Sequence, residues 1–480
     1  MPVSAARQIA FDVLLRVESE SAYASELLHS ALAPDVKPAD AALATEIALG
    51  VLRWRRLLDF LLDRQLKKPI AKLDLPVAIA LRIGLYQLRF LEKIPARAAV
   101  NESVELVKHA RKSSAASLVN AVLRRASADA KAPAEKLLPP NLPLAERLAI
   151  LHSHPTWMVE RWLARFGESG SVELLEANNR PPRLAFAIHD SERREEILRN
   201  LVAAGLRVGP GRLLKDAFAA SGGSIARTET FRAGEISIQD EASQSIPLLL
   251  GVGAGDRVLD LCAAPGGKTI ALARAAGPTG FVVAGDLHEH RLRAMRSQLA
   301  RLHIVTAGCS EDRPENGGAA SGHGQQRNAR ADLVALDAAR PLPFTISFER
   351  ILVDAPCSGT GTLARHPEIR WRLRPEQLSE FHALQTKLLR AALAHLTPGG
   401  RLVYSTCSIE PEENESVVAE VASSAACRIV PAAASAQLLA PHLAPHLHPA
   451  ALFDARGFFH TSPAQQATDG FFAAVLEKSS

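Results

Sequence analysis

Hydrophobic residues recur at three- and four-residue steps through the first 127 residues of the chain. The spacing is clearest in IAFDVLLRVES, ALATEIALGVLRWRRLLDFLLDRQL, LPVAIALRIGLYQLRFL and SLVNAVLRRAS, and it predicts amphipathic helices. Pro34, Pro69, Pro76 and Pro95 separate these runs at places where helices should begin or end. We therefore predict an all-helical N-terminal domain over residues 1–130.

From about residue 236 the pattern changes to short apolar runs that alternate with helical ones. The apolar runs are DRVLDLC, FVVAGDL, DLVALDA, RILVDAPC and RLVYSTCS, and DGFFAAVLEK closes the series. Strands that alternate with helices are typical of a parallel α/β sheet. This predicts an α/β domain over residues 236–480.

Two stretches do not fit either pattern. After a linker rich in Ala, Lys and Pro, residues 145–235 read as a small α+β segment, with helices first and strands near LRVGPGRLL and GSIARTETF. Residues 311–331 are polar and glycine-rich without periodicity, which predicts a disordered surface insertion. We assign no function to this insertion.

Length and composition indicate a multidomain globular protein. The chain has 480 residues, of which 47% are hydrophobic and 22% charged, and two or three domains are expected at this length. No apolar run approaches the ~20 residues of a membrane span, and the N-terminus does not read as a signal peptide. We expect a monomer, because nothing in the sequence suggests a dimer seam. The five cysteines are odd in number and sparse, so we expect no disulfide scaffold, no four-thiolate zinc site and no other metal, and a reducing cytoplasm fits best. They are Cys262, Cys309, Cys357, Cys407 and Cys427.

Positive charge is concentrated in the predicted helical domain. The net charge is +5, and residues 1–136 hold 21 Lys and Arg against 15 Asp and Glu. This balance favours an RNA- or DNA-facing domain, although a solvated helical surface would look the same. The basic residues expected on exposed faces are Arg53, Arg55, Arg56, Lys67, Lys68, Lys108, Arg111, Lys112, Arg124 and Arg125.

Two cysteines each follow a predicted strand of the α/β domain. Cys357 comes after RILVDAP and Cys407 after RLVYST, with Asp354 beside the first of them. Residues at the carboxyl ends of strands in such a sheet face the ligand crevice. Nucleophilic chemistry with a partner thiol is one interpretation, and two small apolar residues filling a core is the other.

A glycine-bearing turn joins the first strand of the α/β domain to a helix. In DRVLDLCAAPGGKT, Gly266 and Gly267 allow a ligand to approach the backbone closely, but the spacing matches neither a P-loop nor GxGxxG. Acidic residues then end three successive strands, at Asp286, Asp337 and Asp354. Acidic groups in this order favour a nucleoside cofactor.

The motifs DLCAAPGGKT, DAPCSGTGT followed by RHPEIRW, YSTCSIEPEENE and DGFF resemble those of the RsmB/NOP family of RNA cytosine-5 methyltransferases. VLRWRRLLDFLL, LYQLRFLEKIPARAAVNESVEL and LVNAVLRR resemble a NusB-type RNA-binding domain, and this fusion is typical of the bacterial 16S ribosomal RNA branch of the family. SHPTWMVERW and LEANNRPP are similar to the family's intermediate segment, although PPRLAFAIHD lacks the expected Arg-x-Asn.

The resemblance implies a seven-stranded Rossmann-like domain that uses S-adenosylmethionine. Cys407 matches the nucleophile, Cys357 the cysteine that assists release, and Asp354 the acid between cofactor and cytosine. Asp286 would bind the ribose, and Asp337 would lie near the adenine, although the 311–331 insertion beside its strand weakens that match. The methionine end would lie in the loop Cys262, Ala263, Ala264, Pro265, Gly266, Gly267 and Lys268.

The resemblance therefore implies methylation of carbon 5 of a cytosine in 16S ribosomal RNA. Two alternatives remain open at this stage: the same chemistry on transfer RNA, and a non-catalytic RNA-binding or antitermination-type protein. A basic segment near the catalytic loop could grip RNA or could be a loop with one packed tryptophan. Its residues are Arg365, His366, Arg370, Trp371 and Arg372.

Overall fold

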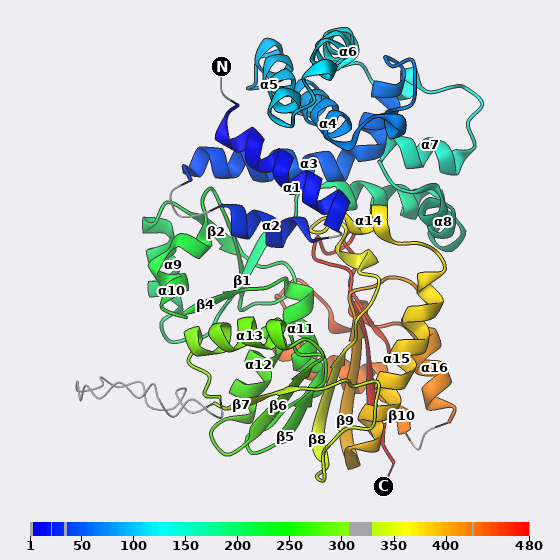
Figure 1. Cartoon of the computed structure of the whole chain (residues 1–480). Helices are drawn as coiled ribbons and strands as arrows, with labels where there is room; N and C mark the ends of the chain where they lie inside the picture. Colours follow the sequence, from blue (N-terminus) through cyan, green and yellow to red (C-terminus); the bar gives the residue numbers. More distant parts are fainter. Residues whose placement is uncertain (1–2, 21, 33–35, 307–328, 425–426, 480) are drawn as a thin grey trace. The chain divides into compact units, whose positions relative to one another are not determined.

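The computed structural model describes residues 3–20, 22–32, 36–306, 329–424 and 427–479. The chain forms two compact units (Figure 1). Unit 1 comprises residues 1–181 together with 362–373, and unit 2 comprises residues 182–361 and 374–480. Most of the predicted insertion at 311–331 lies outside the described residues. No helix in the described part of the chain is both long enough and apolar enough to cross a membrane.

Unit 1 is helical, as the periodicity predicts for residues 1–130, and it also includes the helices at the start of the predicted intermediate segment 145–235, which divides between the two units after residue 181. Its core is built from Leu, Ile, Val and Ala side chains, among them the fully buried Leu14, Leu58 and Ile79. Two prolines occupy predicted boundaries, since Pro76 lies in the first turn of α4 and Pro95 directly precedes α5. The helices are α1 (Ala5–Glu20), α2 (Ala24–Ala31), α3 (Pro38–Asp63), α4 (Leu75–Phe90), α5 (Ala96–His109), α6 (Ala116–Asp129), α7 (Leu144–Leu151), α8 (Thr156–Asn179, bent at Gly167) and α14 (Ile369–Arg372), with 3-10 turns at Ile70–Lys72, Ser113–Ala115 and Ala134–Leu137.

The expectation that Arg53 lies on an exposed face is wrong. Arg53 is only 4% exposed, because its guanidinium donates to the carbonyl of Ala364 at 3.0 Å. Ala364 belongs to the short segment 362–373, which packs within unit 1 although it follows the Cys357 loop in sequence. Sequence periodicity could not show this, because the covering segment lies about 300 residues away along the chain.

The same segment decides between the two interpretations of the basic cluster. Arg370 is fully buried and donates to the carbonyl of Ser153 at 3.0 Å and to Oδ1 of Asn179 at 2.9 Å. The indole N–H of Trp371 donates to the carbonyl of Leu52 at 2.6 Å. Arg370 and Trp371 therefore pack within unit 1, which favours the packed-loop interpretation.

Unit 2 begins with a four-stranded antiparallel sheet in the order β2-β3-β1-β4. The strands are β1 (Leu184–Ile188), β2 (Arg207–Pro210), β3 (Ala217–Ser221) and β4 (Ile236–Ile238), with helices α9 (Arg194–Ala203) and α10 (Glu229–Arg232). The strand predicted near GSIARTETF is wrong: a 3-10 turn, Ile225–Arg227, precedes α10, and the Thr228 hydroxyl caps α10 by accepting from Phe231 N.

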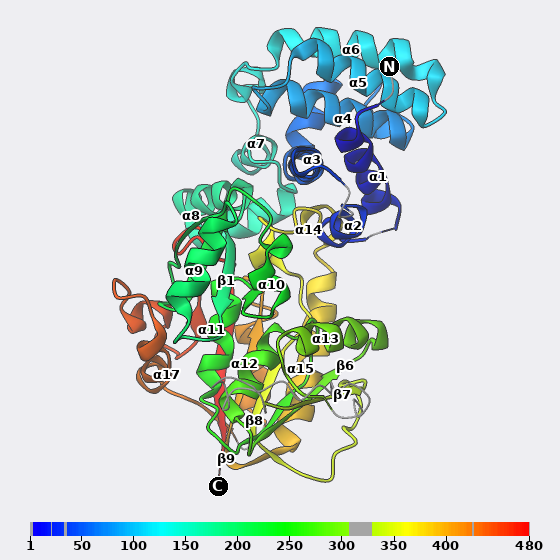
Figure 2. The same ribbon diagram turned by 90° about the vertical axis from the view of Figure 1, so that its left-hand side faces the viewer.

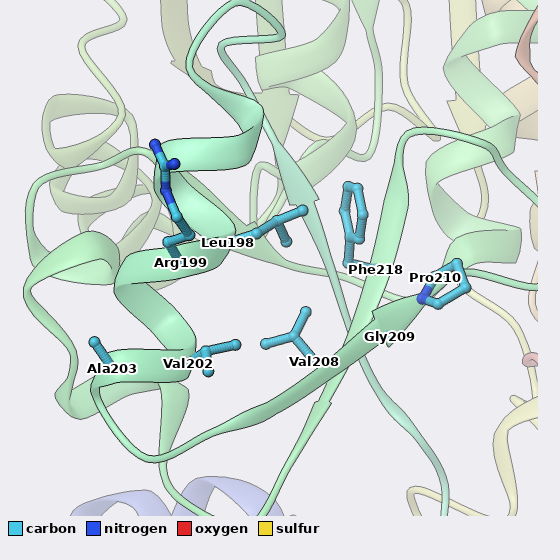
Figure 3. Close-up of a pocket in the computed structure, with 8 residues that line it drawn as sticks. All are labelled: Leu198, Arg199, Val202, Ala203, Val208, Gly209, Pro210 and Phe218. Carbon is cyan, nitrogen blue, oxygen red and sulfur yellow. The ribbon is translucent and has the colours of Figure 1, made fainter.

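An apolar hollow lies between α9 and the edge of this small sheet. In Figure 3, Leu198 and Val202 from α9 face Val208 and Phe218 from the strands. None of the residues predicted to form a catalytic or cofactor site lines this hollow.

The larger sheet of unit 2 has the order β10-β12-β9-β8-β5-β6-β7, and β11 pairs with β12. β9 and β8, β8 and β5, β5 and β6, and β6 and β7 pair in parallel, whereas β12 runs antiparallel to β9. Within the described residues the sheet has the seven strands that the resemblance implies, plus the two-residue β11, and the α/β prediction is confirmed. The strands are β5 (Arg257–Asp260), β6 (Phe281–Asp286), β7 (Ala331–Ala335), β8 (Phe348–Asp354), β9 (Leu396–Thr406), β10 (Cys427–Ile429), β11 (Phe459–His460) and β12 (Phe472–Lys478).

Helices cover both faces of this sheet (Figure 2). Neighbouring strand residues belong to different cores: Val258 packs with α11, α12, α13 and α17, whereas Leu259 packs with α15 and α16. This alternation follows from the two-residue period of a strand. The helices are α11 (Glu241–Leu250), α12 (Gly267–Ala276), α13 (Glu289–Arg301), α15 (Gln377–Ala394), α16 (Glu415–Ala422) and α17 (Ala432–Leu439), with 3-10 turns at Thr360–Thr362, Ala440–His442 and Pro449–Leu452.

Candidate active site

The parallel strands of unit 2 end in polar residues at one edge of the sheet. β5 ends at Asp260, β6 at Asp286 and β8 at Asp354, and Cys407 directly follows β9. Asp354 is in register with Ser405 of the neighbouring strand. The carboxyl ends of parallel strands form the ligand-binding edge of open α/β sheets, so the candidate chemistry gathers there.

The turn after β5 forms one wall of a hollow at this edge. Gly266 has φ of +102°, and a Cβ there would lie 2.8 Å from Cγ of Met295, so the position favours glycine. α12 begins at Gly267, and its N-terminus offers backbone N–H groups. The predicted cofactor residues that line the hollow are Cys262, Ala263, Ala264, Pro265, Gly267, Lys268 and Asp354.

Asp286 lies beside the turn and holds it. Its carboxylate accepts from the backbone N–H of Ala264 at 3.3 Å and of His288 at 3.0 Å, and it lies 3.5 Å from the guanidinium of Arg291. Arg291 in turn donates to the carbonyl of Ala264 at 3.1 Å. The end of β6 is thereby connected to the glycine-bearing turn.

Asp337 is placed differently from the other predicted acids. It lies two residues beyond β7 with a partly exposed side chain, accepts from Ala339 N at 3.0 Å, and pairs with Arg340 at 3.1 Å. Neither Asp337 nor Asp286 is among the described residues that line the hollow, but Asp286 contacts the turn that forms its wall, whereas Asp337 contacts Ala339 and Arg340.

Asp354 is held at the hollow by two side chains. Lys268 Nζ lies 2.7 Å from one carboxylate oxygen, and the hydroxyl of Ser405 donates to the other at 2.8 Å. The Lys268 ammonium also lies 5.1 Å from the ring centroid of Phe471, within cation–π range. The orientation of Asp354 is therefore fixed from both sides.

Asp260 is a site residue that the sequence analysis missed. The residue is 1% exposed, and burial raises the pKa of its carboxyl to about 7, with Asp354 and Asp286 adding to the effect. One oxygen accepts from the Thr269 hydroxyl at 2.6 Å, and the other has no hydrogen-bond partner among the described residues. Asp260 lines the hollow, so a ligand with a donor group could satisfy the second oxygen.

The two candidate cysteines meet at the ends of β8 and β9. The Sγ atoms of Cys357 and Cys407 lie 3.3 Å apart. The hydrogen bond with Cys407 raises the pKa of the Cys357 thiol, and burial raises it further. Burial also raises the pKa of Cys262. The structure therefore provides a close thiol pair in which Cys357 is biased toward keeping its proton.

Two glycines allow the cysteine loops to pack against the DGFF turn. Gly361 N donates to the carbonyl of Cys407 at 2.9 Å, and Gly470 N donates to the carbonyl of Gly361 at 2.8 Å. A Cβ on Gly361 would lie 2.0 Å from the carbonyl oxygen of Gly470. Only glycine fits this contact, which joins three of the sequence motifs.

Comparison with known proteins agrees with this arrangement. The family model "16S rRNA methyltransferase RsmB/F" matches residues 247–477, the NusB family model matches residues 4–128, and a ferredoxin-like domain of RsmF/B-like methyltransferases matches residues 154–222. In the crystal structure of PH0851, the fold agrees with a TM-score of 0.76 at 22% identity over the whole of both chains. A methyltransferase homologue from Pyrococcus horikoshii is 26% identical, with a TM-score of 0.54, and covers 71% of this chain and all of the other.

Curated relatives match most of the chain. A probable ribosomal RNA small subunit methyltransferase B of Bacillus subtilis (strain 168) is 32% identical over 420 residues, covering 87% of this chain and 88% of the relative. The ribosomal RNA small subunit methyltransferase B of Vibrio cholerae is 32% identical over 451 residues, covering 92% of this chain and 91% of the relative. The identity to these relatives extends over nearly the full length, and one chain carries both a helical NusB-type domain and a methyltransferase domain. The protein therefore belongs to the ribosomal RNA small subunit methyltransferase B family.

Proposed function

We propose that this protein transfers the methyl group of S-adenosylmethionine to carbon 5 of a cytosine in 16S ribosomal RNA, through a covalent bond between Cys407 and the base. The observation that carries the proposal is the 3.3 Å separation of the Cys357 and Cys407 sulfur atoms at adjacent strand ends. Asp354, held by Lys268 and Ser405, lies at the end of one of these strands.

The residues around the hollow fit S-adenosylmethionine. The turn from Cys262 to Lys268 and the N-terminus of α12 suit the methionine carboxylate, because unpaired N–H groups bind anions. The unpartnered oxygen of Asp260 suits the ammonium group. Asp286 would bind the ribose hydroxyls, and Asp337 would lie toward the adenine. When bound, the cofactor supplies an electrophilic methyl group.

Cys407 makes the base reactive. Carbon 5 of cytosine is a weak nucleophile, and addition of the Cys407 thiolate to carbon 6 turns the ring into an enamine with electron density on carbon 5. Cys357 keeps its proton and can donate a hydrogen bond to the Cys407 sulfur, which stabilises the thiolate. Asp354 would face ring nitrogen 3, where a proton shared between the carboxyl group and the nitrogen would stabilise the negative charge that develops as the thiolate adds.

Product release reverses the covalent bond. After methylation, carbon 5 must lose its hydrogen as a proton while the electron pair expels Cys407 from carbon 6 as a thiolate. Cys357, whose sulfur lies 3.3 Å from that of Cys407, can give its proton to the departing sulfur, and the resulting Cys357 thiolate can take the proton from carbon 5. The target cytosine must be unstacked to reach these groups.

Ribosomal RNA is the substrate that the chain's domains and relatives support. The curated relatives carry the name ribosomal RNA small subunit methyltransferase B, and the N-terminal helices match the NusB family. The excess of basic residues over residues 1–136 suits a polyanion.

The test measures methyl transfer from tritiated S-adenosylmethionine to unmodified 16S ribosomal RNA and to transfer RNA, with 5-methylcytosine mapped by bisulfite sequencing. We expect one modified cytosine in 16S RNA, loss of activity in Cys407→Ala, and normal activity in the matched control Cys427→Ala, whose cysteine lies on β10. Turnover by Cys407→Ala, or methylation confined to transfer RNA, would contradict the proposal.

A further inference from the structure

Each candidate catalytic cysteine is followed directly by a serine, and both serines contact the same carboxylate. Ser358 follows Cys357, and Ser408 follows Cys407. The hydroxyl of Ser408 donates to Oε1 of Glu413 at 2.6 Å, and the hydroxyl of Ser358 donates to the same oxygen. All three side chains are buried. One carboxylate thus connects the loop after β8 to the loop after β9.

The second oxygen of Glu413 completes the connection. Oε2 accepts from the backbone N–H of Ser358 at 2.8 Å and from the side-chain amide of Gln385 at 3.0 Å. Two donors on each oxygen use the capacity of an ionised carboxylate. Burial raises the pKa of Glu413, whereas these four hydrogen bonds favour its charged form.

The direction of the hydrogen bonds around Ser408 supports an ionised Glu413. The Ser408 hydroxyl oxygen lies 3.0 Å from Glu410 N, which donates to it, and 3.2 Å from the hydroxyl of Thr360. Thr360 accepts from Ile409 N at 3.1 Å, so its own proton is available for Ser408. The Ser358 and Ser408 hydroxyl oxygens also lie 3.1 Å apart, and each hydroxyl is placed to donate its proton to Oε1 of Glu413.

The backbone of Glu413 is anchored as well. The phenolic hydroxyl of Tyr404, a fully buried residue of β9, donates to the Glu413 carbonyl at 2.6 Å. The residue that carries the carboxylate is therefore attached through its backbone to the sheet that carries both cysteine loops.

We propose that Glu413 is a positioning residue that sets the spacing of the two thiols by binding the serine next to each cysteine. The inference rests on the proposed two-thiol function and adds a residue to it. Glu413 itself touches neither sulfur in these contacts, and it acts through Ser358 and Ser408. Its negative charge additionally contributes to the raised pKa of Cys357.

The test compares Glu413→Gln with the matched control Glu420→Gln, an exposed glutamate of α16 that pairs with His382 and Arg390. A glutamine keeps the shape but presents an N–H₂ group to one pair of donors. We expect kcat for methylation to fall about 10- to 100-fold, because small misplacements of reacting groups cost this much. The KM for RNA and the affinity for S-adenosylmethionine should stay near the wild-type values, and Glu420→Gln should keep wild-type kcat.

A second measurement separates positioning from general destabilisation. In a Cys357→Ala background, the rate at which Cys407 forms a covalent RNA adduct should fall about tenfold or more when Glu413→Gln is added. If Glu413→Gln does not fold, Ser358→Ala and Ser408→Ala each remove one donor and should slow the same step with unchanged cofactor binding.

Unchanged kcat and adduct formation in Glu413→Gln, or losses that only parallel lost cofactor binding, would overturn the positioning role. Failure of Cys357→Ala alone to form any adduct would instead contradict the proposed function itself. The two failures are therefore distinguishable.

Discussion

Replacing Asp260 with asparagine should make unit 2 more stable at alkaline pH. The carboxyl is 1% exposed at the end of β5, and burial raises its pKa from 3.8 to about 7. An asparagine can still accept the hydrogen bond from Thr269, which Asp260 accepts at 2.6 Å. The substitution therefore removes a buried ionisable group while keeping its shape and one contact.

The sign of the pH dependence follows from proton binding. In the unfolded chain Asp260 ionises near pH 3.8, whereas in the folded protein it keeps its proton up to about pH 7. Between these values the folded state binds more protons, so the free energy of unfolding decreases as the pH rises. One pKa unit corresponds to about 1.4 kcal/mol, so between pH 5 and pH 8 the wild type should lose about 3 kcal/mol that Asp260→Asn keeps.

The assay must follow unit 2 separately from unit 1. All four tryptophans, at positions 54, 157, 162 and 371, belong to unit 1, so their fluorescence serves as an internal reference. Hydrogen–deuterium exchange of β5 peptides, measured against urea at pH 5 and pH 8, gives the stability of unit 2.

The expected result is a gain for Asp260→Asn over wild type that is about 3 kcal/mol larger at pH 8 than at pH 5. The control Asp332→Asn removes a carboxylate of β7 that is 25% exposed and paired with Arg330, and it should show no such gain. A difference between Asp260→Asn and wild type that is the same at both pH values would refute the reasoning.

Three further substitutions test other parts of the structure. Arg370→Met should destabilise unit 1 by about 3–5 kcal/mol, because it leaves buried carbonyl groups without donors. Urea unfolding followed by tryptophan fluorescence measures this loss, and a loss below about 1 kcal/mol would contradict the packed role of Arg370. Gly361→Ala should cost about 1–3 kcal/mol in unit 2 because its Cβ would lie 2.0 Å from the Gly470 carbonyl oxygen, and β9 exchange that stays as slow as in wild type would disprove the clash. Asp286→Ala should weaken cofactor binding in calorimetry without changing RNA affinity, and unchanged cofactor affinity would count against its role in the site.

Local patterns predicted the elements and the thiols, because they depend on residues close together in sequence. An apolar run that ends in Asp-Ala-Pro-Cys or Ser-Thr-Cys identifies a strand followed by a loop, and parallel strands bring such loops to one edge. Cys357 and Cys407 are 50 residues apart, and their contact follows once β8 and β9 are neighbours.

Other residues could not be predicted, because their roles depend on distant partners. Glu413 lies in the acidic run PEENE, where every carboxylate looks solvated until the chain folds back on both cysteine loops. Arg370 reads as part of a basic cluster, and its partners Arg53 and Ser153 lie 317 and 217 residues away. Asp260 was recoverable in principle, because an acid that ends an apolar strand directly before the glycine-bearing turn is placed to face a ligand.

The most direct test of the central claim is to isolate Cys357→Ala under denaturing conditions and to sequence any RNA that stays attached. If Cys407 attacks the base and Cys357 assists its release, the variant should carry a covalent adduct to one cytosine of 16S ribosomal RNA, and the adduct should vanish in Cys357→Ala/Cys407→Ala. Absence of attached RNA while methylation continues at the normal rate would contradict the division of roles between the two thiols.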